Sequence, residues 1–425
     1  MADGRTADDV SVEAFAAEAR QWLAANAKPR VEAKEGELVP GDPFSVSVFH
    51  ALSHEQEHAL LEEARRWNQA KAERGYHAIT WPKEYGGLGL SKDHGRAFGR
   101  LEAEYDTPPR HELFGVTTGL IAPTVRQFGT PEQKERFVAS FLRTDEYVCQ
   151  LFSEPGAGSD LASLACKAER DGDEWIVNGQ KVWSSGAQFS AWGELIARTD
   201  PDVAKHKGMT AFLVPFDLPG VEVRPIKQMS GGQSFNEVFF NDVRIPDSLR
   251  LGEVGSGWNV ALTTLGFERD HSASGGGGGG RAGGSWRHLL ASARQADELG
   301  DPVARQALMR MYTHTRIESF VNRRAADLRA AGAPPGPEGS LGKLLWTEGM
   351  RLMSDVVSEV VGPQLIADTG EWGTYEWGEH VLGAPGYRIA GGSDEVQRNI
   401  VGERVLGLPG EPRVDKDVPW RAIPR

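Results

Sequence analysis

Cysteine is scarce in this sequence: only Cys149 and Cys166 occur among 425 residues. Two cysteines do not form the disulfide framework of a small secreted protein, so we expect a chain of the reducing cytoplasm. Long apolar runs are lacking too, because no stretch approaches the ~18 residues that a membrane-spanning helix needs. The polar N-terminus has no apolar core of a secretory leader. These absences predict a cytoplasmic protein without a membrane span.

Basic residues are fewer than acidic residues in this chain. Lysine and arginine number 47 against 60 aspartates and glutamates, which gives a formal net charge of −13. An acidic chain is a poor candidate for general nucleic-acid binding, although a local cationic or amide-lined site still suits a small anion. With 40% hydrophobic and 25% charged residues, the chain is not disordered. Its length fits two to four domains at roughly 100–200 residues each.

The first third of the chain has helical periodicity. Apolar residues recur at helical spacing from Phe15 to Leu23, and a second apolar face predicts a helix over residues 45–72. Thr130 is followed at once by proline and, two positions later, by glutamine, which is typical of a capped helix start. We therefore expect an all-α domain over residues 1–146.

The period then changes from helix to strand. Short β-branched or aromatic runs, bounded by Gly, Pro or Asp, occupy residues 209–216, 221–225 and 234–245. Asn178-Gly179 follows another such run and predicts a hairpin turn. This block favours a middle β-domain, a barrel or a sandwich, over residues 147–250.

Helical patterns return in the last part. They predict helices over residues 302–329, 340–361 and 393–406, the last with Ser393 as its N-cap. We expect a helical domain over residues 251–408 and a polar tail at the surface over residues 409–425. The order α, β, α defines an α+β multidomain protein.

Two short motifs are weak. His54-Glu55-Gln56-Glu57-His58 matches the zinc-protease pattern, but its helix already packs through an apolar face, and no third ligand follows at a recognisable spacing. The ordinary interpretation is a solvated helix face. Gly275–Gly280 fits the dinucleotide fingerprint only because six consecutive glycines fit any glycine pattern, and no strand precedes it. We expect no metal site and no Rossmann unit.

Two segments of the predicted β-domain point to a ligand. Gln150–Leu161 contains Gly156 and Gly158, which allow close backbone approach, together with hydroxyl side chains. Trp175–Gly186 places a tryptophan beside two serines, which suits a planar heteroaromatic group.

These two blocks resemble the acyl-CoA dehydrogenase family, and four further segments extend the resemblance over nearly the whole chain. They are Trp81-Pro-Lys-Glu-Tyr-Gly-Gly-Leu-Gly89, the pair Gly208–Pro215 with Asn236–Pro246, and the closing signature Ile389–Pro409. The resemblance implies an N-terminal helical domain, a middle β-domain and a C-terminal four-helix bundle. It also implies FAD between the last two.

The resemblance assigns site residues in turn. Contacts to the isoalloxazine ring would come from Gln150, Phe152, Ser153, Trp183, Ser184 and Ser185. Gly158 and Ser159 would line the flavin and the thioester entrance, and Ser393 and Glu395 would lie near the ADP portion. For each residue the structural alternative is a core, turn or N-cap role.

The reaction of the family needs a carboxylate base. Many members place it just before the Gly-Thr of the closing signature, where this chain has Gly391. A minority place it on an earlier helix before an arginine, and Glu268-Arg269 stands there. The resemblance thus implies Glu268 as the base that removes the α-proton, while the flavin takes the β-hydride. Arg269, Gly391 and Ser159 would contact the substrate.

Two departures bear on partners. The family's Arg-x-x-Phe-Gly and Gln-x-x-Gly-Gly-x-Gly segments, which serve FAD across a subunit interface, are not recognisable at residues 293–302 and 359–364. This resembles the actinobacterial steroid side-chain dehydrogenases, which form α2β2 assemblies, although a homodimer or homotetramer stays open. An electron-transfer flavoprotein would accept the electrons. A flavin oxidase or monooxygenase of the same fold and a non-catalytic subunit are the alternatives.

The glycines near the base helix bear on the acyl group. Gly391 removes a side chain at the usual base position, and Gly275–Gly280 removes six more shortly after the predicted base. Missing side chains leave volume that a substrate fills or that costs stability as a cavity. We expect a bulky, branched or polycyclic acyl group, with a surface linker as the alternative for the glycine run.

Overall fold

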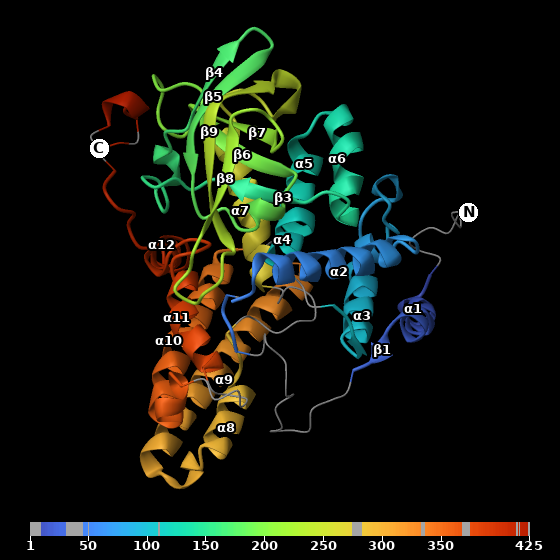
Figure 1. Ribbon diagram of the computed structural model, residues 1–425, viewed down its shortest axis with the longest axis vertical. Coiled ribbons are helices and arrows are strands. Elements are labelled where there is room, and N and C mark those ends of the chain that lie inside the picture. The colour runs from blue at the N-terminus through green and yellow to red at the C-terminus, as the bar shows by residue number, and fades with distance from the viewer. Residues whose placement is uncertain are drawn as a thin grey trace.

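The computed structural model describes residues 10–30, 46–49, 51–108, 111–273, 283–332, 336–367, 375–413, 415 and 417–423, with only the backbone at 269–273, 330, 338 and 376. Helices precede and follow one mixed sheet, as the α, β, α order predicts (Figure 1). The Gly275–Gly280 run lies outside the described residues.

The N-terminal region is helical. Its helices are α1 (Val12–Asn26), α2 (His54–Ala72), α3 (Lys92–Glu102), α4 (Glu112–Gly115), α5 (Ala122–Phe128) and α6 (Pro131–Arg143). The predicted start of α6 is confirmed, because the Thr130 hydroxyl accepts from the Gln133 backbone and the Gln133 side chain accepts from the Thr130 backbone. A two-residue antiparallel pair, β1 (Lys28–Pro29) with β2 (Tyr105–Asp106), joins the segment after α1 to the segment after α3.

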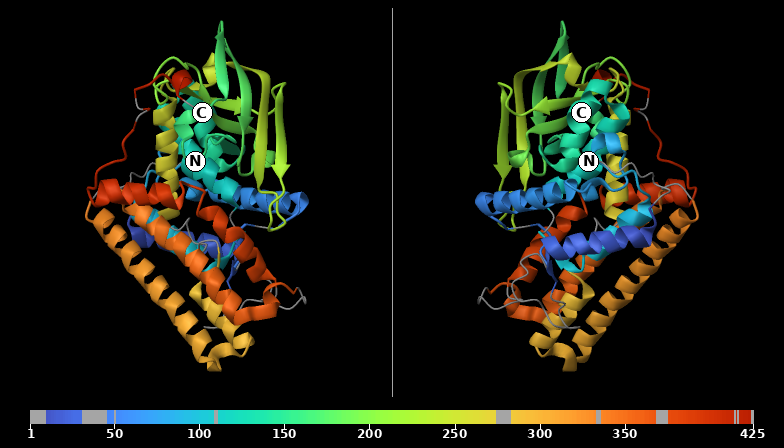
Figure 2. Two further views of the ribbon diagram at one scale, coloured as in Figure 1. Left: turned by 90° about the vertical axis from the view of Figure 1, so that its left-hand side faces the viewer. Right: turned by 90° about the vertical axis from the view of Figure 1, so that its right-hand side faces the viewer.

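The predicted start of the second helix near residue 45 was wrong. α2 begins at His54, since Ser53 and Gln56 form a capping box there. Residues 46–49 run ahead of it instead, and Val48 and Phe49 pack against the C-terminal helices. In Figure 2, α2 crosses between the sheet and these helices.

One eight-stranded mixed sheet forms the middle region, with strand order β10-β7-β6-β4-β5-β9-β8 and β3 parallel to β6. The strands are β3 (Val148–Leu151), β4 (Lys167–Asp171), β5 (Glu174–Lys181), β6 (Trp192–Arg198), β7 (Met209–Pro215), β8 (Val221–Ile226), β9 (Phe235–Pro246) and β10 (Arg250–Leu251). Their fully buried apolar side chains, among them Val177, Phe212 and Val243, form the core of this domain.

The hairpin predicted at Asn178-Gly179 was wrong. β5 continues through both residues with a bulge after Val177, and the chain reverses earlier, between β4 and β5. Gly179 is needed for close approach rather than for a turn, because a Cβ there would lie 2.7 Å from the Cys166 Cα atom.

The C-terminal region contains α7 (Gly257–Ala273), α8 (Trp286–Gln295), α9 (Pro302–Ala330), α10 (Glu338–Val361), α11 (Glu376–Tyr387) and α12 (Asp394–Ile400). α9 begins as predicted, since the Asp301 carboxylate caps its first backbone amides. α7 differs from the other helices: it packs against the sheet and α5, while α9 and α10 extend away from the sheet (Figure 1).

The C-terminal tail is docked rather than free. It runs from α12 along the side of the sheet (Figure 1), and Pro419 forms an antiparallel β-bridge with Ala204. The Trp420 indole donates to the Ser163 carbonyl at 3.2 Å and lies under the Arg198 guanidinium. Lys205 pairs with Asp415 at 2.6 Å, so the tail is held at both ends of this segment.

Candidate active site

The glycine-rich turn after β3 is fixed from its inner side. Glu154 and Ala157 exchange two backbone hydrogen bonds of 3.0 Å, and the Glu154 carboxylate accepts from two further backbone amides and from Lys181 at 2.7 Å. On the outer side, a Cβ on Gly156 or Gly158 would meet nothing within 4 Å. The turn therefore presents open, glycine-lined backbone to whatever binds there.

The structure brings the two predicted flavin blocks together. Val182 donates its backbone N–H to the Ser153 carbonyl at 2.9 Å, and the buried Lys181 ammonium donates to the Phe152 carbonyl at 3.0 Å. Segments about thirty residues apart in sequence thus form one surface. Phe152 and Ser184 are buried within it, while Gly158 and Ser159 are exposed at its rim.

Trp183 lies in this surface in a strained conformation. Its φ of +61° is in the left-handed region, which costs a bulky residue about 1–3 kcal/mol. The loop is held by hydrogen bonds from the Ser184 and Gly186 amides to the Asn236 and Ser234 carbonyls. The indole is 58% exposed and meets Phe235 edge to face. A large aromatic ring is thus exposed to solvent by a backbone conformation that a bulky residue disfavours.

Two polar atoms in the same surface are buried without a partner among the described residues. They are the Gln150 side-chain nitrogen and the Ser184 hydroxyl. A buried polar group left unpaired costs about 1–3 kcal/mol, so such atoms indicate a ligand or water. Both residues belong to the set predicted for the flavin. The donor set, the open glycine turn and the exposed indole therefore fit a flavin at this place.

Glu268 on α7 meets Gly391 from the closing signature. Gly391 has a φ of +62°, and a Cβ built on it would lie 2.8 Å from the Glu268 Oε1 atom. The carboxylate of Glu268 therefore occupies the space into which a side chain at position 391 would point. The two positions that the family uses for its base meet at one point of this chain.

Lys343 on α10 stands beside this carboxylate. Its ammonium donates to the Ala390 and Gly392 carbonyls, on either side of Gly391. Burial lowers its pKa to about 8, against the opposing charges of Glu268 and Asp394. Lys343 thus fixes the turn that faces Glu268 and places a titratable cation next to it.

Tyr387 and Glu112 extend the site away from Gly391. Burial raises the pKa of the Tyr387 phenol, and the charges of Glu112 and Glu268 raise it further. Burial also raises the pKa of the Glu112 carboxyl. Glu112 itself is exposed at the surface. The charges of both carboxyl groups therefore act on the Tyr387 phenol.

The remaining predicted residues lie on the C-terminal helices. Ser393 caps α12 by accepting from the Val396 amide at 3.4 Å, and the exposed Glu395 pairs with Arg398 at 3.7 Å. Arg269 follows Glu268 on α7, and its side chain lies outside the described residues. For Ser393 the geometry matches the capping alternative.

Sequence reasoning missed Lys343, Glu112 and Tyr387. Each stands in a segment without a motif, and each reaches the site from a different helix. Lys343 carries the one usable signal, a lysine in an otherwise apolar stretch of a predicted helix. The contacts that give it a role span 47 and 49 residues of sequence.

The zinc-like motif has a structural role. His54 stacks on Phe189 at 4.7 Å between ring centroids, and Glu57 is buried, accepting from the His111 ring at 2.6 Å. The solvated helix face is thus correct for His54 and His58 but wrong for Glu57. In the part of the chain that the structure describes, no three His, Cys, Asp or Glu side chains converge as metal ligands would.

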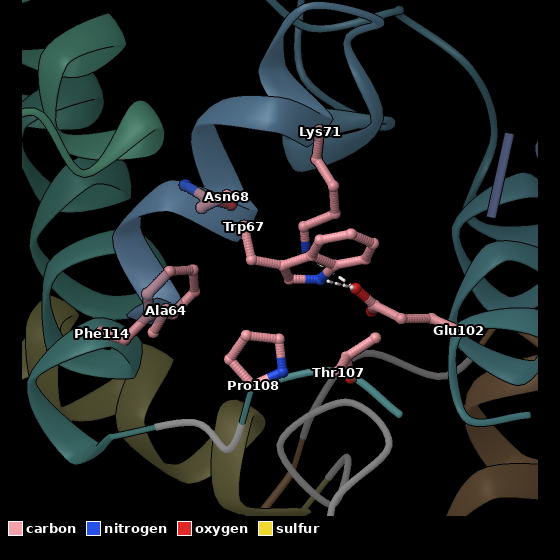
Figure 3. Close-up of a pocket in the computed structure, with 8 residues that line it drawn as sticks. All are labelled: Ala64, Trp67, Asn68, Lys71, Glu102, Thr107, Pro108 and Phe114. Atoms are coloured by element: carbon pink, nitrogen blue, oxygen red, sulfur yellow. Dashed lines mark hydrogen bonds and ion pairs between the residues drawn. The ribbon is translucent and has the colours of Figure 1, made fainter. Parts of the chain in front are cut away.

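A small cavity lies elsewhere, between α2 and the end of α3 (Figure 3). Its volume is about 20 Å³, which is room for about one water molecule. Its charged groups are satisfied, because Lys71 and the Trp67 indole both donate to Glu102. This cavity is a packing feature and does not form part of the site.

Models of one protein family match all three regions of this architecture. Family models of acyl-CoA dehydrogenase match residues 46–145 for the N-terminal domain, 149–243 for the middle domain and 255–406 for the C-terminal domain. The chain belongs to the acyl-CoA dehydrogenase family. It is accordingly an oxidoreductase of the acyl-CoA dehydrogenase type, in a family of flavoproteins.

Individual relatives cover nearly the whole chain. The acyl-CoA dehydrogenase IpdE1 of Mycobacterium tuberculosis is 40% identical over 402 residues, 94% of this chain and 98% of that protein. The solved Tcur3481-Tcur3483 steroid ACAD is 26% identical, with a TM-score of 0.74 over 96% of this chain and 100% of that one. The ChsE4-ChsE5 complex from Mycobacterium tuberculosis is also 26% identical, with a TM-score of 0.69 over 97% and 100%.

Across the described ranges, no helix combines the length and the apolar character needed to cross a bilayer.

Proposed function

We propose that this protein dehydrogenates an acyl-CoA thioester to its trans-2-enoyl-CoA, with Glu268 as the base and FAD as the cofactor. One observation carries the proposal: the Glu268 carboxylate fills the space beside Gly391, where a family base on the closing signature would point. A carboxylate is thereby supplied to that position from α7.

The chemistry requires such a base. The α-C–H of a thioester is a weak acid, and its proton is removed by a carboxylate whose basicity is raised in an apolar, enclosed pocket. FAD, when bound, supplies the acceptor for the β-hydride. Hydrogen-bond donors at the thioester oxygen stabilise the charge that develops there.

The chain's own residues divide into three groups. Gln150, Phe152, Ser153, Trp183, Ser184 and Ser185 would hold the flavin ring, with Gly158 and Ser159 at the thioester entrance. Ser393 and Glu395 would lie toward the ADP portion. The turn at Gly391 and the following Arg269 of α7 would face the substrate beside Glu268.

We infer a bulky acyl group. A glycine at position 391 withdraws a side chain from the substrate side, and a solved relative is described as a steroid ACAD. The measurement is the catalytic efficiency with octanoyl-CoA against a steroid-side-chain CoA ester. A clear preference for octanoyl-CoA would refute the wide pocket.

We also infer an assembly with a related subunit, with an electron-transfer flavoprotein as the acceptor. Two segments that reach across the family's subunit interface are not recognisable here, and two solved relatives carry the names of two proteins each. A chain that purifies as a homo-oligomer saturated with FAD would contradict the heteromeric assembly. If the assembly of this chain with its partner is reduced by the thioester equally well when Glu268 of this chain is replaced, the non-catalytic alternative is favoured.

The test is anaerobic flavin reduction. The purified protein, with its partner chain if it needs one, is mixed with a panel of acyl-CoA esters, and the flavin absorbance is followed. Glu268→Gln should bind flavin and thioester normally but lose at least 10²–10⁴-fold in reduction rate, because the amide accepts no proton. Glu169→Gln, at an exposed carboxylate on β4, is the control. Near wild-type reduction by Glu268→Gln would place the base elsewhere.

A further inference from the structure

The C-terminal tail lies beyond the part of the chain that the family model matches, which ends at residue 406. It nevertheless docks on the loop between β6 and β7. The Trp420 amide donates to the Val203 carbonyl at 2.9 Å. Arg421 donates from its backbone to the Pro201 carbonyl at 3.1 Å, and its guanidinium pairs with Asp202 at 2.6 Å. Backbone hydrogen bonds and an ion pair thus fix the tail against this loop.

Lys205 lies on the same loop and connects the tail with the glycine-rich turn. Its ammonium donates to both carboxylate oxygens of Asp160 at 3.0 Å, and it pairs with Asp415 of the tail at 2.6 Å. The Lys205 side chain is only 9% exposed, so its charge depends on these carboxylates more than on water. One ammonium therefore joins a tail carboxylate to the residue that follows Gly158 and Ser159.

Asp160 anchors the far end of the glycine-rich turn. Its carboxylate accepts from the Ser163 hydroxyl at 2.5 Å, and its backbone carbonyl accepts from the Ser163 amide at 3.0 Å. The near end is held separately, through the backbone and the carboxylate of Glu154. Between these anchors lie Gly158, where a Cβ would meet nothing within 4 Å, and the exposed Ser159. The direction of this rim is therefore set by the contacts of Asp160.

Arg198 and Trp420 hold the segment that follows the turn. The buried Arg198 guanidinium donates to the Ala162 carbonyl and to the Lys205 carbonyl, each at 2.6 Å. It thereby joins the segment after Asp160 to the loop that carries Lys205. The Trp420 ring lies 4.9 Å from the guanidinium carbon of Arg198. Loop and tail thus form one support for the turn.

We propose that Asp415 and Lys205 are positioning residues, which hold the glycine-rich turn in the conformation that binds the thioester. This inference rests on the proposed function, which puts Gly158 and Ser159 at the thioester entrance. A glycine-rich backbone has many accessible conformations, and a ligand that needs one of them binds in proportion to the fraction already in place. Ion pairs between exposed groups add little, whereas the Lys205 ammonium is withdrawn from water. The tail thus acts on substrate affinity through the turn.

The affinity is measured without turnover in the Glu268→Gln background. Octanoyl-CoA and a steroid-side-chain CoA ester are titrated by calorimetry into the flavin-loaded full chain, with its partner chain if it needs one. Lys205→Met should raise the dissociation constant of the ester that binds by about 10-fold, as the loss of a hydrogen bond to a charged group does. Lys205→Arg keeps the charge between the two carboxylates and should restore most of the affinity.

Asp415→Asn tests the route of the effect. This change should weaken binding when Lys205 is present and cause no further loss in Lys205→Met, because both residues act through one ammonium. Losses that multiply in the double variant would overturn the route through Lys205. Lys167→Met, which breaks the exposed pair of Lys167 with Glu169 on β4, is the matched control and should leave the dissociation constant unchanged.

Two further readouts distinguish positioning from a general structural defect. With Glu268 in place, Lys205→Met should raise the ester concentration for half-maximal flavin reduction and leave the limiting rate unchanged. A general defect would lower the limiting rate and the flavin content as well. Hydrogen exchange at the Ser163 amide, which bonds to the Asp160 carbonyl, should accelerate in Lys205→Met without any substrate present.

The outcomes separate this inference from the proposed function. Unchanged dissociation constants, or a fall in the limiting rate alone, in a protein that reduces its flavin would overturn the positioning role and leave the dehydrogenase function intact. Failure of the wild type to reduce its flavin with any ester would overturn the proposed function, and with it the role in thioester binding. Asp415→Asn, a change in the surface tail, gives an independent reading if Lys205→Met does not fold.

Discussion

The Oε1 atom of Glu268 lies 2.8 Å from the point that a Cβ atom on Gly391 would occupy. The relationship is reciprocal: a side chain at position 391 would displace the carboxylate, and the carboxylate leaves no room for a side chain. A glycine there is therefore required by contact as well as by its φ of +62°. An apparently missing base at one position and a glutamate at another are two aspects of one arrangement.

This relationship predicts the effect of Gly391→Ala. The new methyl group would push the Glu268 carboxylate aside, and a displacement of about 1 Å at a reacting group costs about 10²-fold in rate. We expect flavin binding to persist and anaerobic flavin reduction to fall by about that factor. Gly407→Ala is the control, since Gly407 has a similar φ of +67° and a Cβ there would meet nothing within 4 Å. Equal rates for Gly391→Ala and wild type would contradict the arrangement.

Lys343→Met should change the pH dependence of flavin reduction. The ammonium of Lys343 favours the ionised form of Glu268, so its removal should move the ascending limb of the rate–pH profile to higher pH. In the wild type, loss of the Lys343 proton at a pKa of about 8 should add an inflection there. Tyr387, Asp394 and Glu112 also bear on this region and remain in the variant.

Stopped-flow reduction from pH 6 to pH 9 measures this shift. Lys343→Arg, which keeps the positive charge, should retain the wild-type ascending limb while losing the inflection near pH 8. A Lys343→Met profile that differs from wild type only in amplitude would show that Lys343 holds the turn without influencing the base.

The docked tail makes a separate prediction about stability. Trp420 donates to Ser163 and lies 4.9 Å from the Arg198 guanidinium carbon, so it braces the segment that follows the glycine-rich turn. Trp420→Ala should lower the free energy of unfolding by about 1–3 kcal/mol. Hydrogen exchange at the amides of residues 161–166 should accelerate. Trp420→Phe, which keeps a ring under Arg198, should lose less; unchanged exchange in Trp420→Ala would show that the tail braces nothing.

Local chemistry accounts for what the sequence predicted well. The α6 start at Thr130 and the α9 start after Asp301 depend on side chains that bond backbone amides two or three residues away, so the signal and the structure lie in the same segment. The two blocks predicted to hold the flavin stand out in the sequence because each is a compact motif, and the hydrogen bond from Val182 to the Ser153 carbonyl brings them together.

The errors and omissions have long-range causes. Asn178-Gly179 matches a turn signal in the sequence, but β5 pairs with β9 on both sides of it and Cys166 packs against Gly179. These contacts override the local signal. Glu112 and Tyr387 lie on α4 and α11, and the packing of Phe49 against Tyr387 that orients the second of them joins residues far apart in sequence. Periodicity carries no information about such pairs.

Glu194 gives a prediction that concerns stability alone. This carboxyl on β6 is fully buried, where Oε1 accepts from the Thr264 hydroxyl at 2.8 Å, and Thr264 in turn contacts Thr124 at 2.9 Å. Burial raises the pKa of Glu194 from 4.5 to about 8. The folded protein therefore keeps this proton at neutral pH, while the unfolded chain has already lost it.

Between pH 4.5 and pH 8 the unfolded state thus binds fewer protons at this site than the folded state, so stability falls as pH rises. The slope from this group is up to about 1.4 kcal/mol per pH unit. Glu194→Gln mimics the protonated carboxyl and should remove the slope, leaving stability unchanged near pH 4.5 and raised near pH 8. Urea unfolding of wild type and variant across this range measures it, with the exposed Glu169→Gln as control. Parallel stability curves for wild type and Glu194→Gln would mean that Glu194 is ionised in the folded protein and that the Thr264 hydroxyl alone does not account for its burial.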